Sequence, residues 1–443
     1  MELIRNLQRL WRHRLFRRLL AVRITVQSCD GLLQVALASY VLFSPERQPD
    51  AVSVAIVLAV TLLPFSIAGP FVSVVLDRWS RRQALVTVDL ARSALSLVLA
   101  GIVAIGWSNG GPGEVTFYGI VLVLMSLNRF VLAALSASLP HTIDPDEYLV
   151  ANSVMPTIGP AGTVVGAGVG LGVRLGLGGL LADNHVDAIL FALAAIGYLG
   201  SVGLALRFSR GQLGPDIADP TRAADVLAGL RATVQHLQER SPAGVGLLLI
   251  AAHRIPYGLV TVATILVYRN HFHPVADVDA ALADLGIVLG ATAGGFVLAA
   301  VLTAPAVRRL GLRAWMIVCL LAAAVVQLLP GAIYVHGFLV VAAALSGVLA
   351  QSIKISVDTL VQVHVDDDHK GRTFTFYDMI FNVCLVLGAV ACALLMPPDG
   401  RSVAVLAGVS TCYLLTAVVF TVVTRRMPRA RFDEAGHVDS RSQ

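Results

Sequence analysis

Two oppositely charged side chains lie inside long apolar stretches of the chain. Asp30 falls in the stretch 19–43 and Arg129 in the stretch 116–139. If both stretches are helices, these residues lie about 17 Å and about 15 Å from the helix ends on one side of the molecule. Opposite charges at one depth stabilise each other, whereas either alone is costly in an apolar surrounding.

These two residues have the chemistry for proton exchange. A neighbouring cation favours an ionised carboxyl, and removal from water favours the neutral form. We expect Asp30 to carry a proton and Arg129 to set the affinity of Asp30 for that proton. The alternative is a static ion pair that fixes the register of two helices.

A second polar group, His253 and Arg254, lies in the middle of a later apolar stretch. Ionisable residues at mid-membrane depth usually have a function. We predict that a cavity for a small-molecule substrate, with Arg254 near an anionic or polar group of that substrate, is lined by Gln27, Gln34, His253, Arg254 and Tyr257. The alternative for Arg254 is a structural pair with a carboxylate elsewhere in the chain.

The composition indicates a protein of the membrane. Of 443 residues, 56% are hydrophobic and 14% are charged, whereas a soluble domain has about 25% charged residues. This composition argues against a soluble globular domain and excludes the disordered and nucleic-acid-binding classes. A membrane-spanning helix needs about 20 apolar residues, and helices satisfy their own backbone groups in lipid. The predicted spans are 19–43, 52–76, 85–106, 116–139, 153–178, 184–206, 243–268, 281–305, 314–333, 337–357, 374–396 and 402–424.

The basic residues give the orientation of these spans. Most of the 33 lysine and arginine residues fall in both termini and in one set of loops. The other set of loops carries only Arg47, Arg174, Arg269 and Arg401. Basic loops stay in the cytoplasm, so both termini are expected there, in a bacterial inner membrane. The net charge of +5 is therefore interpreted as a topology signal.

The longest loop, 207–242, divides the chain into halves of six spans each. We predict an N-terminal bundle 1–206, a cytoplasmic linker 207–242 with an amphipathic helix, a C-terminal bundle 243–424 and a tail 425–443. Basic loop sequences that follow the second and eighth spans resemble each other at about half the chain length. Such similarity is typical of transporters built from parallel six-helix repeats.

One cytoplasmic loop carries a family motif. The sequence Ser73-Val74-Val75-Leu76-Asp77-Arg78-Trp79-Ser80-Arg81-Arg82 resembles the G-x-L-a-D-R-x-G-R-R loop of the major facilitator superfamily, with serine in place of both glycines. The stretches 85–92, 360–362 and 366–372 resemble the branch of drug and macrolide efflux proteins and siderophore exporters. With the spans, the resemblance covers nearly the whole chain. It implies an all-α membrane protein whose twelve helices form two pseudo-symmetric six-helix bundles.

The resemblance also implies roles for particular residues. A latch between the bundles would be formed by Asp77, Arg78, Arg81, Arg82 and Arg372. The alternative is that these arginines only anchor the loop to anionic lipid. Arg129 resembles an embedded arginine of the fourth helix that is linked to proton coupling. The fifth span resembles the antiporter motif of the family's fifth helix, which is common in exporters, at Gly159, Pro160, Gly162 and Gly166. The spacing of these residues also suits close helix packing.

Other motifs are not found in the sequence. The five cysteines form no CxxC pair, and His271 and His273 stand without further ligands, so we expect no disulfide framework, metal or cofactor. Phosphate-binding and nucleophile-elbow motifs are absent, which argues against an enzyme or an ATP-driven pump. Asp89 and Arg92 are three residues apart near the cytoplasmic end of their span, and we expect them to pair with each other. Together with Lys354 and Asp358, they are interpreted as peripheral gate or register contacts.

We therefore expect a proton-coupled secondary transporter that exports a hydrophobic or amphiphilic small molecule. Its partners would be that substrate, protons and the lipid bilayer, without nucleic acid, and it would be a monomer. The alternatives are an importer or uniporter of a small metabolite, and a non-transporting membrane scaffold or sensor of the same fold.

Overall fold

The computed structural model describes residues 10–42, 51–67, 79–107, 111–144, 148–214, 233–235, 237, 241–274, 277–329, 331–365, 367–425 and 427. Within these residues the regular structure is helical. The α-helices are α2 (Arg14–Leu37), α3 (Ala51–Ile67), α5 (Arg81–Ala104), α6 (Gly111–Ser138), α7 (Tyr148–Leu177), α8 (Asp183–Ala205), α10 (Ser241–Val267), α11 (Val278–Leu310), α12 (Leu312–Leu328), α13 (His336–His364), α14 (Asp367–Leu395) and α15 (Val403–Arg425).

Each predicted span overlaps one of these α-helices, which confirms an all-helical protein. Of the described helices, nine are long and apolar enough to cross a membrane. Helices α3 and α12 are shorter apolar helices, and α2 carries Arg23, Gln27, Asp30 and Gln34 in its sequence. The amphipathic linker helix, predicted around 221–239, lies almost wholly outside the described residues.

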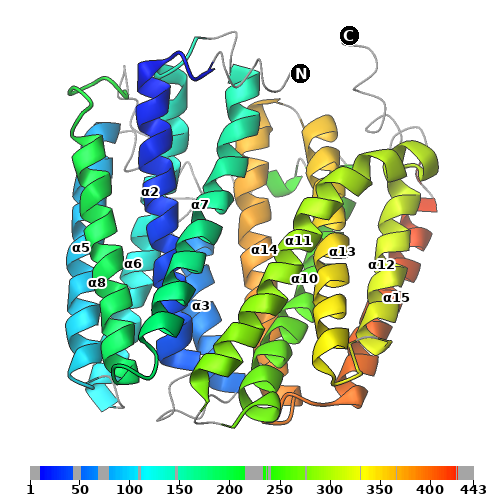
Figure 1. Ribbon diagram of the computed structural model, residues 1–443. Coiled ribbons are helices and arrows are strands. Elements are labelled where there is room, and N and C mark those ends of the chain that lie inside the picture. The colour runs from blue at the N-terminus through cyan, green and yellow to red at the C-terminus, as the bar shows by residue number, and fades with distance from the viewer. Residues whose placement is uncertain are drawn as a thin grey trace. The chain divides into compact units, whose positions relative to one another are not determined.

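The chain divides into two compact units. The N-terminal unit comprises Met1–Gln48 and Val60–Val226, and the C-terminal unit comprises Pro49–Ala59 and Leu227–Gln443. The boundary between the two units falls inside α3. The helices of each unit are labelled in Figure 1.

In the N-terminal unit, α2 packs against α7 and α8, and α5 packs against α8 and α6. Glycines bring α2 and α7 into backbone contact. A Cβ atom at Gly166 of α7 would lie 1.8 Å from the carbonyl oxygen of Ser28, and one at Gly31 of α2 would lie 1.9 Å from that of Thr163. Larger residues at Gly31 or Gly166 would force the two helices apart.

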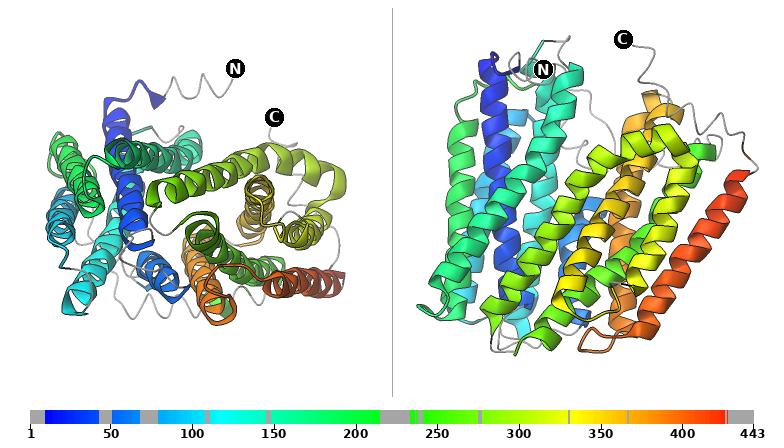
Figure 2. Two further views of the ribbon diagram at one scale, coloured as in Figure 1. Left: turned by 60° about the horizontal axis from the view of Figure 1, so that its bottom comes forward. Right: turned by 45° about the vertical axis from the view of Figure 1, so that its right-hand side comes forward.

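In the C-terminal unit, the closest pairs are α10 with α14, α11 with α13, and α12 with α15. Glycines also join α10 to α14, since a Cβ atom at Gly258 would lie 2.3 Å from the carbonyl oxygen of Leu385. Helix α11 contains Pro305 near its end, and Figure 2 shows that the last part of the α11 ribbon bends before α12. Proline explains such a bend because it removes a helical hydrogen bond.

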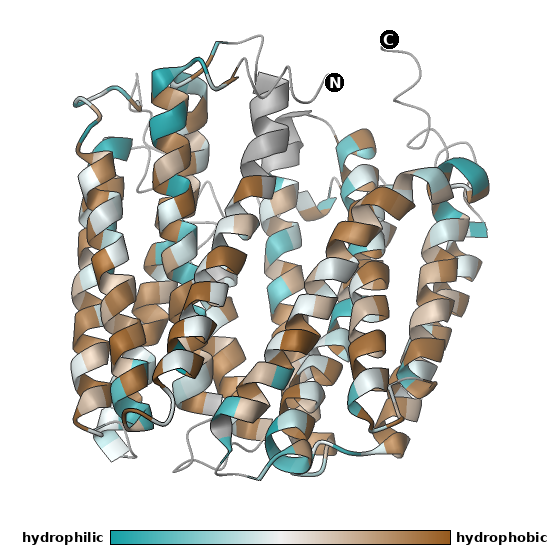
Figure 3. Cartoon of the chain, in the orientation of Figure 1, coloured by the Kyte–Doolittle hydropathy of each residue, from teal (hydrophilic) through white to brown (hydrophobic). Residues whose placement is uncertain are grey.

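Apolar side chains cover the outer surface of the described helices. Figure 3 shows brown, hydrophobic residues along the middle of most helices and teal, hydrophilic ones toward their ends. Val297, Leu394 and Val418 are among many large apolar residues that are more than half exposed. An exposed apolar surface of this extent suits contact with lipid.

The first helix of each predicted half ends in a rare π-helical turn. Helix α2 continues into η1 (Ala38–Leu42), and α10 continues into η5 (Tyr268–Phe272). Tyr40 of the first turn and Tyr268 of the second are both buried. A short 3₁₀ turn, η3 (Leu139–His141), follows α6.

Candidate functional site

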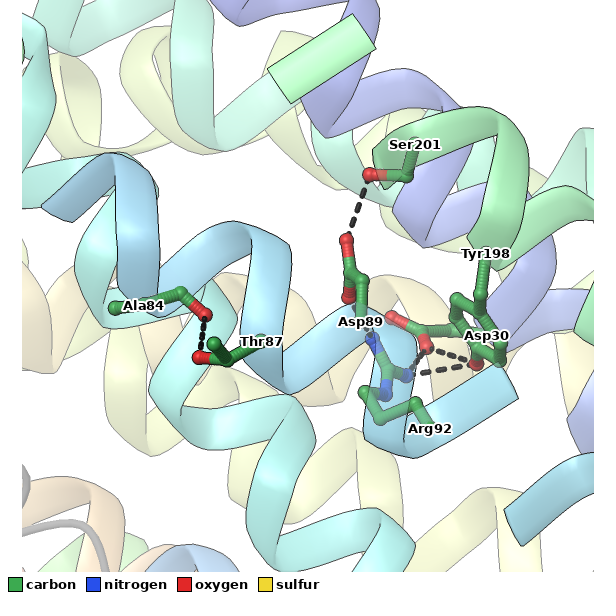
Figure 4. A network of polar contacts seen from close by, with 7 residues as sticks. All are labelled: Asp30, Ala84, Thr87, Asp89, Arg92, Tyr198 and Ser201. Carbon is green, nitrogen blue, oxygen red and sulfur yellow. Dashed lines mark hydrogen bonds and ion pairs between the residues drawn. The ribbon is translucent and has the colours of Figure 1, made fainter. Parts of the chain in front are cut away.

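A buried polar network joins three helices of the N-terminal unit. It consists of Asp30 of α2, Asp89 and Arg92 of α5, and Tyr198 and Ser201 of α8, which we call the acid network (Figure 4). Asp30 is 4% exposed, and the other four are fully buried. Groups of this kind are rarely buried unless they are paired.

Arg92 is the centre of the acid network. Its Nη2 donates hydrogen bonds to Asp30 Oδ1 and to the Tyr198 hydroxyl, the latter over 2.7 Å, and its Nη1 lies 3.4 Å from Asp89 Oδ1. Tyr198 donates to the same Asp30 oxygen over 2.8 Å, and Ser201 donates to Asp89 Oδ2 over 2.6 Å. The Arg92 guanidinium carbon lies 4.1 Å from the Tyr198 ring centroid.

The helices explain why these groups meet. Asp89 and Arg92 are three residues apart, so they share one face of α5. Arg92 lies eleven residues after the start of α5 at Arg81, which is about 17 Å along the helix axis. That face is fixed on α8 by the Ser93 hydroxyl, which donates to the Ala195 carbonyl over 2.9 Å. Asp89 and Arg92 of the acid network therefore lie far from the start of the apolar helix α5.

The charges of the acid network do not balance when all its groups are ionised. Asp30 and Asp89 supply two negative charges and Arg92 supplies one positive charge. One bound proton makes the set neutral. An uncompensated buried charge costs several kcal/mol, so the arrangement is suited to hold one exchangeable proton on a carboxyl.

The structure corrects the pairing expected for Asp30. Its ion-pair partner is Arg92, and not Arg129. Arg129 belongs to α6 and is half-buried, whereas α2 packs mainly against α7 and α8. Equal depth in the membrane is necessary for a pair, but two side chains must also face each other around their helix axes.

The structure confirms the expected pairing of Asp89 with Arg92, but their peripheral position is wrong, and the sequence does not select Tyr198 and Ser201. The available signal was an acid and a base three residues apart in an apolar stretch. In a span of 85–106 the pair falls within the first turns, whereas α5 begins at Arg81 and places both residues deeper along the helix.

The predicted residues Gln27 and Gln34 lie on α2. Gln27 is half-buried against Gly159 of α7, where a Cβ atom would lie 2.0 Å from Gln27 Oε1. That oxygen is buried without a hydrogen-bond partner. Gln34 is exposed. Whether either side chain faces a substrate stays a prediction.

The glycines of the predicted fifth-helix motif lie where α7 meets α2. Gly159, Gly162 and Gly166 are buried, and Pro160 is exposed. The Gly162 carbonyl accepts a hydrogen bond from the Ser28 hydroxyl over 3.0 Å. These glycines therefore permit close packing of the two helices, and a hinge function stays a prediction.

Of the predicted latch, Asp77 and Arg78 lie outside the described residues. Arg81 donates to the carbonyls of Ala137 over 2.9 Å and Leu213 over 3.1 Å. Arg82 donates to the Leu206 carbonyl over 3.3 Å. These contacts join the start of α5 to the end of α6 and to the segment after α8.

Arg372, the remaining residue of the predicted latch, is exposed on α14. The latch between the bundles stays a prediction.

In the C-terminal unit, His253, Arg254 and Tyr257 lie together on α10. The Arg254 guanidinium carbon is 3.3 Å from the Phe381 ring centroid and 5.0 Å from that of Tyr257. The His253 ring lies between Tyr257 and Tyr413, with centroid distances of 5.7 Å and 5.6 Å. Among the described residues, Arg254 has neither an ion pair nor a hydrogen bond.

Two further charged pairs of this unit lie among the described residues. Lys354 Nζ lies 2.7 Å from Asp358, and His273 lies 2.9 Å from Asp284. Within the part of the chain that the structure describes, no group of three potential ligands is placed to hold a metal ion.

Comparison with known proteins identifies the family. Residues 246–441 match the sequence profile of the Major Facilitator Superfamily. An uncharacterized MFS-type transporter of Mycobacterium tuberculosis is 36% identical over 418 residues, which cover 93% of this chain and 91% of the relative. An uncharacterized MFS-type transporter of Mycobacterium bovis matches to the same extent.

Solved structures agree with this assignment at the level of the fold. The nucleoside transporter NupG aligns with a TM-score of 0.69 at 12% identity, over 93% of this chain and 99% of its own. The human organic anion transporter MFSD10 aligns with a TM-score of 0.60 at 13% identity, over 91% and 99% of the two chains. The chain therefore belongs to the major facilitator superfamily and is a membrane transporter of that type.

Proposed function

We propose that this protein is a proton-coupled secondary transporter that exports a hydrophobic or amphiphilic small molecule by alternating access. In this proposal it resembles the drug and siderophore efflux branch of the family. Twelve helices would form two six-helix bundles in a bacterial inner membrane, with both termini in the cytoplasm. The acid network around Arg92 is the observation that carries the proposal.

The acid network supplies the groups that proton coupling requires. Asp30 and Asp89 share one cation, Arg92, so the acid network favours one bound proton while both carboxyls are buried beside it. These groups come from three helices, α2, α5 and α8. A change in the packing of these helices would separate Asp30 from Arg92 and would let water reach the carboxyl. Proton release and rebinding would then follow the transport cycle.

Two features support export of an amphiphile. The stretch Gly159–Gly166 resembles a motif that is common in exporters, and its glycines let α7 pack directly on α2. Several charges of the described helices are also paired with each other, such as Arg92 with Asp30, Arg174 with Asp183, and Lys354 with Asp358. A strongly charged, hydrophilic substrate would find few partners in such a protein.

Everted membrane vesicles that contain the protein test the proposal. Three fluorescent or radiolabelled probes are added to the solution outside the vesicles. They are an anionic amphiphile (2-naphthoate), a cationic amphiphile (ethidium) and a weakly basic amphiphile (Hoechst 33342). An exporter should accumulate at least one probe when respiration acidifies the interior, and collapse of the pH gradient should stop this. Asp30→Asn should abolish gradient-driven uptake but keep the exchange of preloaded probe.

Asp187→Asn is the matched control for Asp30→Asn. Asp187 is another buried acid of the N-terminal unit, bonded to the Ser39 hydroxyl over 2.5 Å and 3.9 Å from Arg174. Coupling should survive in this variant. Gradient-driven uptake by Asp30→Asn at the wild-type rate would refute the role of Asp30. Accumulation only in right-side-out vesicles would indicate an importer, and equilibration without a gradient would indicate a uniporter.

A further inference from the structure

We propose that Arg254, with the rings of Phe381 and Tyr257, forms a binding subsite for the carboxylate of an amphiphilic organic anion. This inference rests on the proposed function and names the substrate class. The subsite lies wholly within the C-terminal unit, between α10 and α14.

The first step is the missing counter-charge. Two other buried arginines have carboxylates beside them: Arg92 has Asp30 and Asp89, and Arg174 has Asp183 at 2.5 Å. Arg254 is 8% exposed, yet among the described residues it has no carboxylate partner. A buried cation without an anion is costly, and an anionic ligand would supply the missing charge.

The second step is the direction from which a ligand can approach. The Nε atom of Arg254 is buried without a hydrogen-bond partner. The two terminal nitrogens of Arg254, which also have no hydrogen bond among the described residues, are not fully buried. A guanidinium presents such a pair of N–H groups in a fork that matches both oxygens of one carboxylate.

The third step is the aromatic surrounding. Phe381 lies against one side of the guanidinium at 3.3 Å, and Tyr257 lies at 5.0 Å. Cation–π contacts of this kind stabilise a desolvated arginine only in part. The same rings offer an apolar surface to the body of a ligand whose carboxylate meets the guanidinium. This combination favours a flat or aromatic anion over an inorganic one.

The fourth step is rigidity. Gly258 of α10 contacts the Leu385 carbonyl of α14, and Gly388 of α14 contacts the Ile255 carbonyl of α10, so that added Cβ atoms would lie 2.3 Å and 2.1 Å away. Both contacts lie within about two turns after Arg254 on α10 and after Phe381 on α14, so they fix the spacing of the two helices next to this pair. A side chain that is already fixed in place loses little freedom when a ligand binds.

Binding to the purified, full-length protein in lipid nanodiscs tests the inference without any ion gradient. The probes are 2-naphthoate and its neutral isostere 2-naphthamide, measured by isothermal titration calorimetry. Wild type should bind 2-naphthoate at least tenfold more tightly than 2-naphthamide. Arg254→Gln should weaken 2-naphthoate binding by about tenfold to hundredfold, the loss of charge-assisted hydrogen bonds, and should remove the preference. Arg254→Lys should keep part of the preference for 2-naphthoate over 2-naphthamide.

Arg401→Gln is the control variant, because Arg401 also lies over a ring, 5.2 Å from the Tyr334 centroid, but at an exposed position. It should bind like wild type. Thermal unfolding provides a second readout: Arg254→Gln without ligand should be at least as stable as wild type, because the unpaired charge is removed, and 2-naphthoate should raise only the wild-type melting temperature. Destabilisation of Arg254→Gln would indicate a purely structural cation.

Equal binding of the two probes to wild type, or no binding of either, would overturn the subsite. The binding assay tests the Arg254 subsite, and the vesicle assay tests proton-coupled export, so either proposal can be contradicted without the other. Binding that depends on Arg254 without gradient-driven transport would contradict the proposed function alone. Gradient-driven transport of a neutral or cationic probe, unaffected by Arg254→Gln, would contradict this inference alone.

Discussion

Replacing Arg92 with glutamine removes the cation of the acid network and leaves Asp30 and Asp89 buried together. With Arg92 present, the network is neutral when it holds one proton, and without Arg92 it is neutral only when it holds two. The variant must therefore bind one additional proton in the folded state. Arg92→Gln is expected to destabilise the protein by the cost of that proton.

The cost follows from the ordinary behaviour of aspartate. The pKa of a solvent-exposed aspartate is about 3.9, and each pH unit above it adds about 1.4 kcal/mol to the cost of protonation. The additional proton therefore costs about 4 kcal/mol at pH 7 and about 2 kcal/mol at pH 5.5. The value at pH 7 agrees with the roughly 3–5 kcal/mol that is typical when one partner of a buried ion pair is removed.

The sign of the pH dependence is also fixed. The folded variant binds more protons than its unfolded chain, so its stability falls as the pH rises. Relative to wild type, the deficit should grow by about 1.4 kcal/mol for each pH unit. Lowering the pH from 7 to 5.5 should therefore restore about half of the lost stability.

Thermal unfolding of the purified protein in detergent micelles, followed by fluorescence, measures both effects. A deficit of about 4 kcal/mol corresponds to a fall in melting temperature on the order of 10 °C. Asp89→Asn combined with Arg92→Gln should recover most of the loss, because that variant again needs only one proton. A shift below 3 °C, or the same shift at both pH values, would refute the charge count.

Two further predictions concern packing and topology. Gly166→Ala should lower the free energy of unfolding by about 1–3 kcal/mol, because its Cβ atom would lie 1.8 Å from the Ser28 carbonyl oxygen. Gly168→Ala is the control, since the space around its Cβ atom is open, and it should leave the melting temperature unchanged. Equal effects of the two substitutions would contradict the packing argument. A fluorescent protein fused after Gln443 should fluoresce and an alkaline phosphatase fused there should be inactive, whereas active phosphatase would reverse the predicted orientation.

The helices could be predicted because the bilayer allows few alternatives. A spanning segment must be long, apolar and helical, and these properties are local in sequence. Each predicted span therefore overlaps an observed helix. The family could be inferred for a related reason, since Asp77, Arg78, Arg81 and Arg82 form a contiguous motif.

The partners within the site could not be predicted in the same way. Depth along a helix follows from counting residues, but the direction of a side chain around the helix axis depends on which helices are neighbours. Asp30 and Arg129 have matching depths, yet Asp30 meets Arg92 because α5 and α2 both pack on α8. Tyr198 carries no formal charge, so an inventory of charged residues could not select it.

The two π turns at the ends of α2 and α10 bear on the history of the chain. They begin at Ala38 and Tyr268, 230 positions apart, close to half the length of the protein. A π turn arises when one residue is inserted into an α-helix, which rotates the following side chains by about 100°. If the two predicted halves are repeats of one six-helix unit, a single insertion before the duplication accounts for both turns more simply than two separate events. On this account the turns are older than the acids and the arginine that now distinguish the two units.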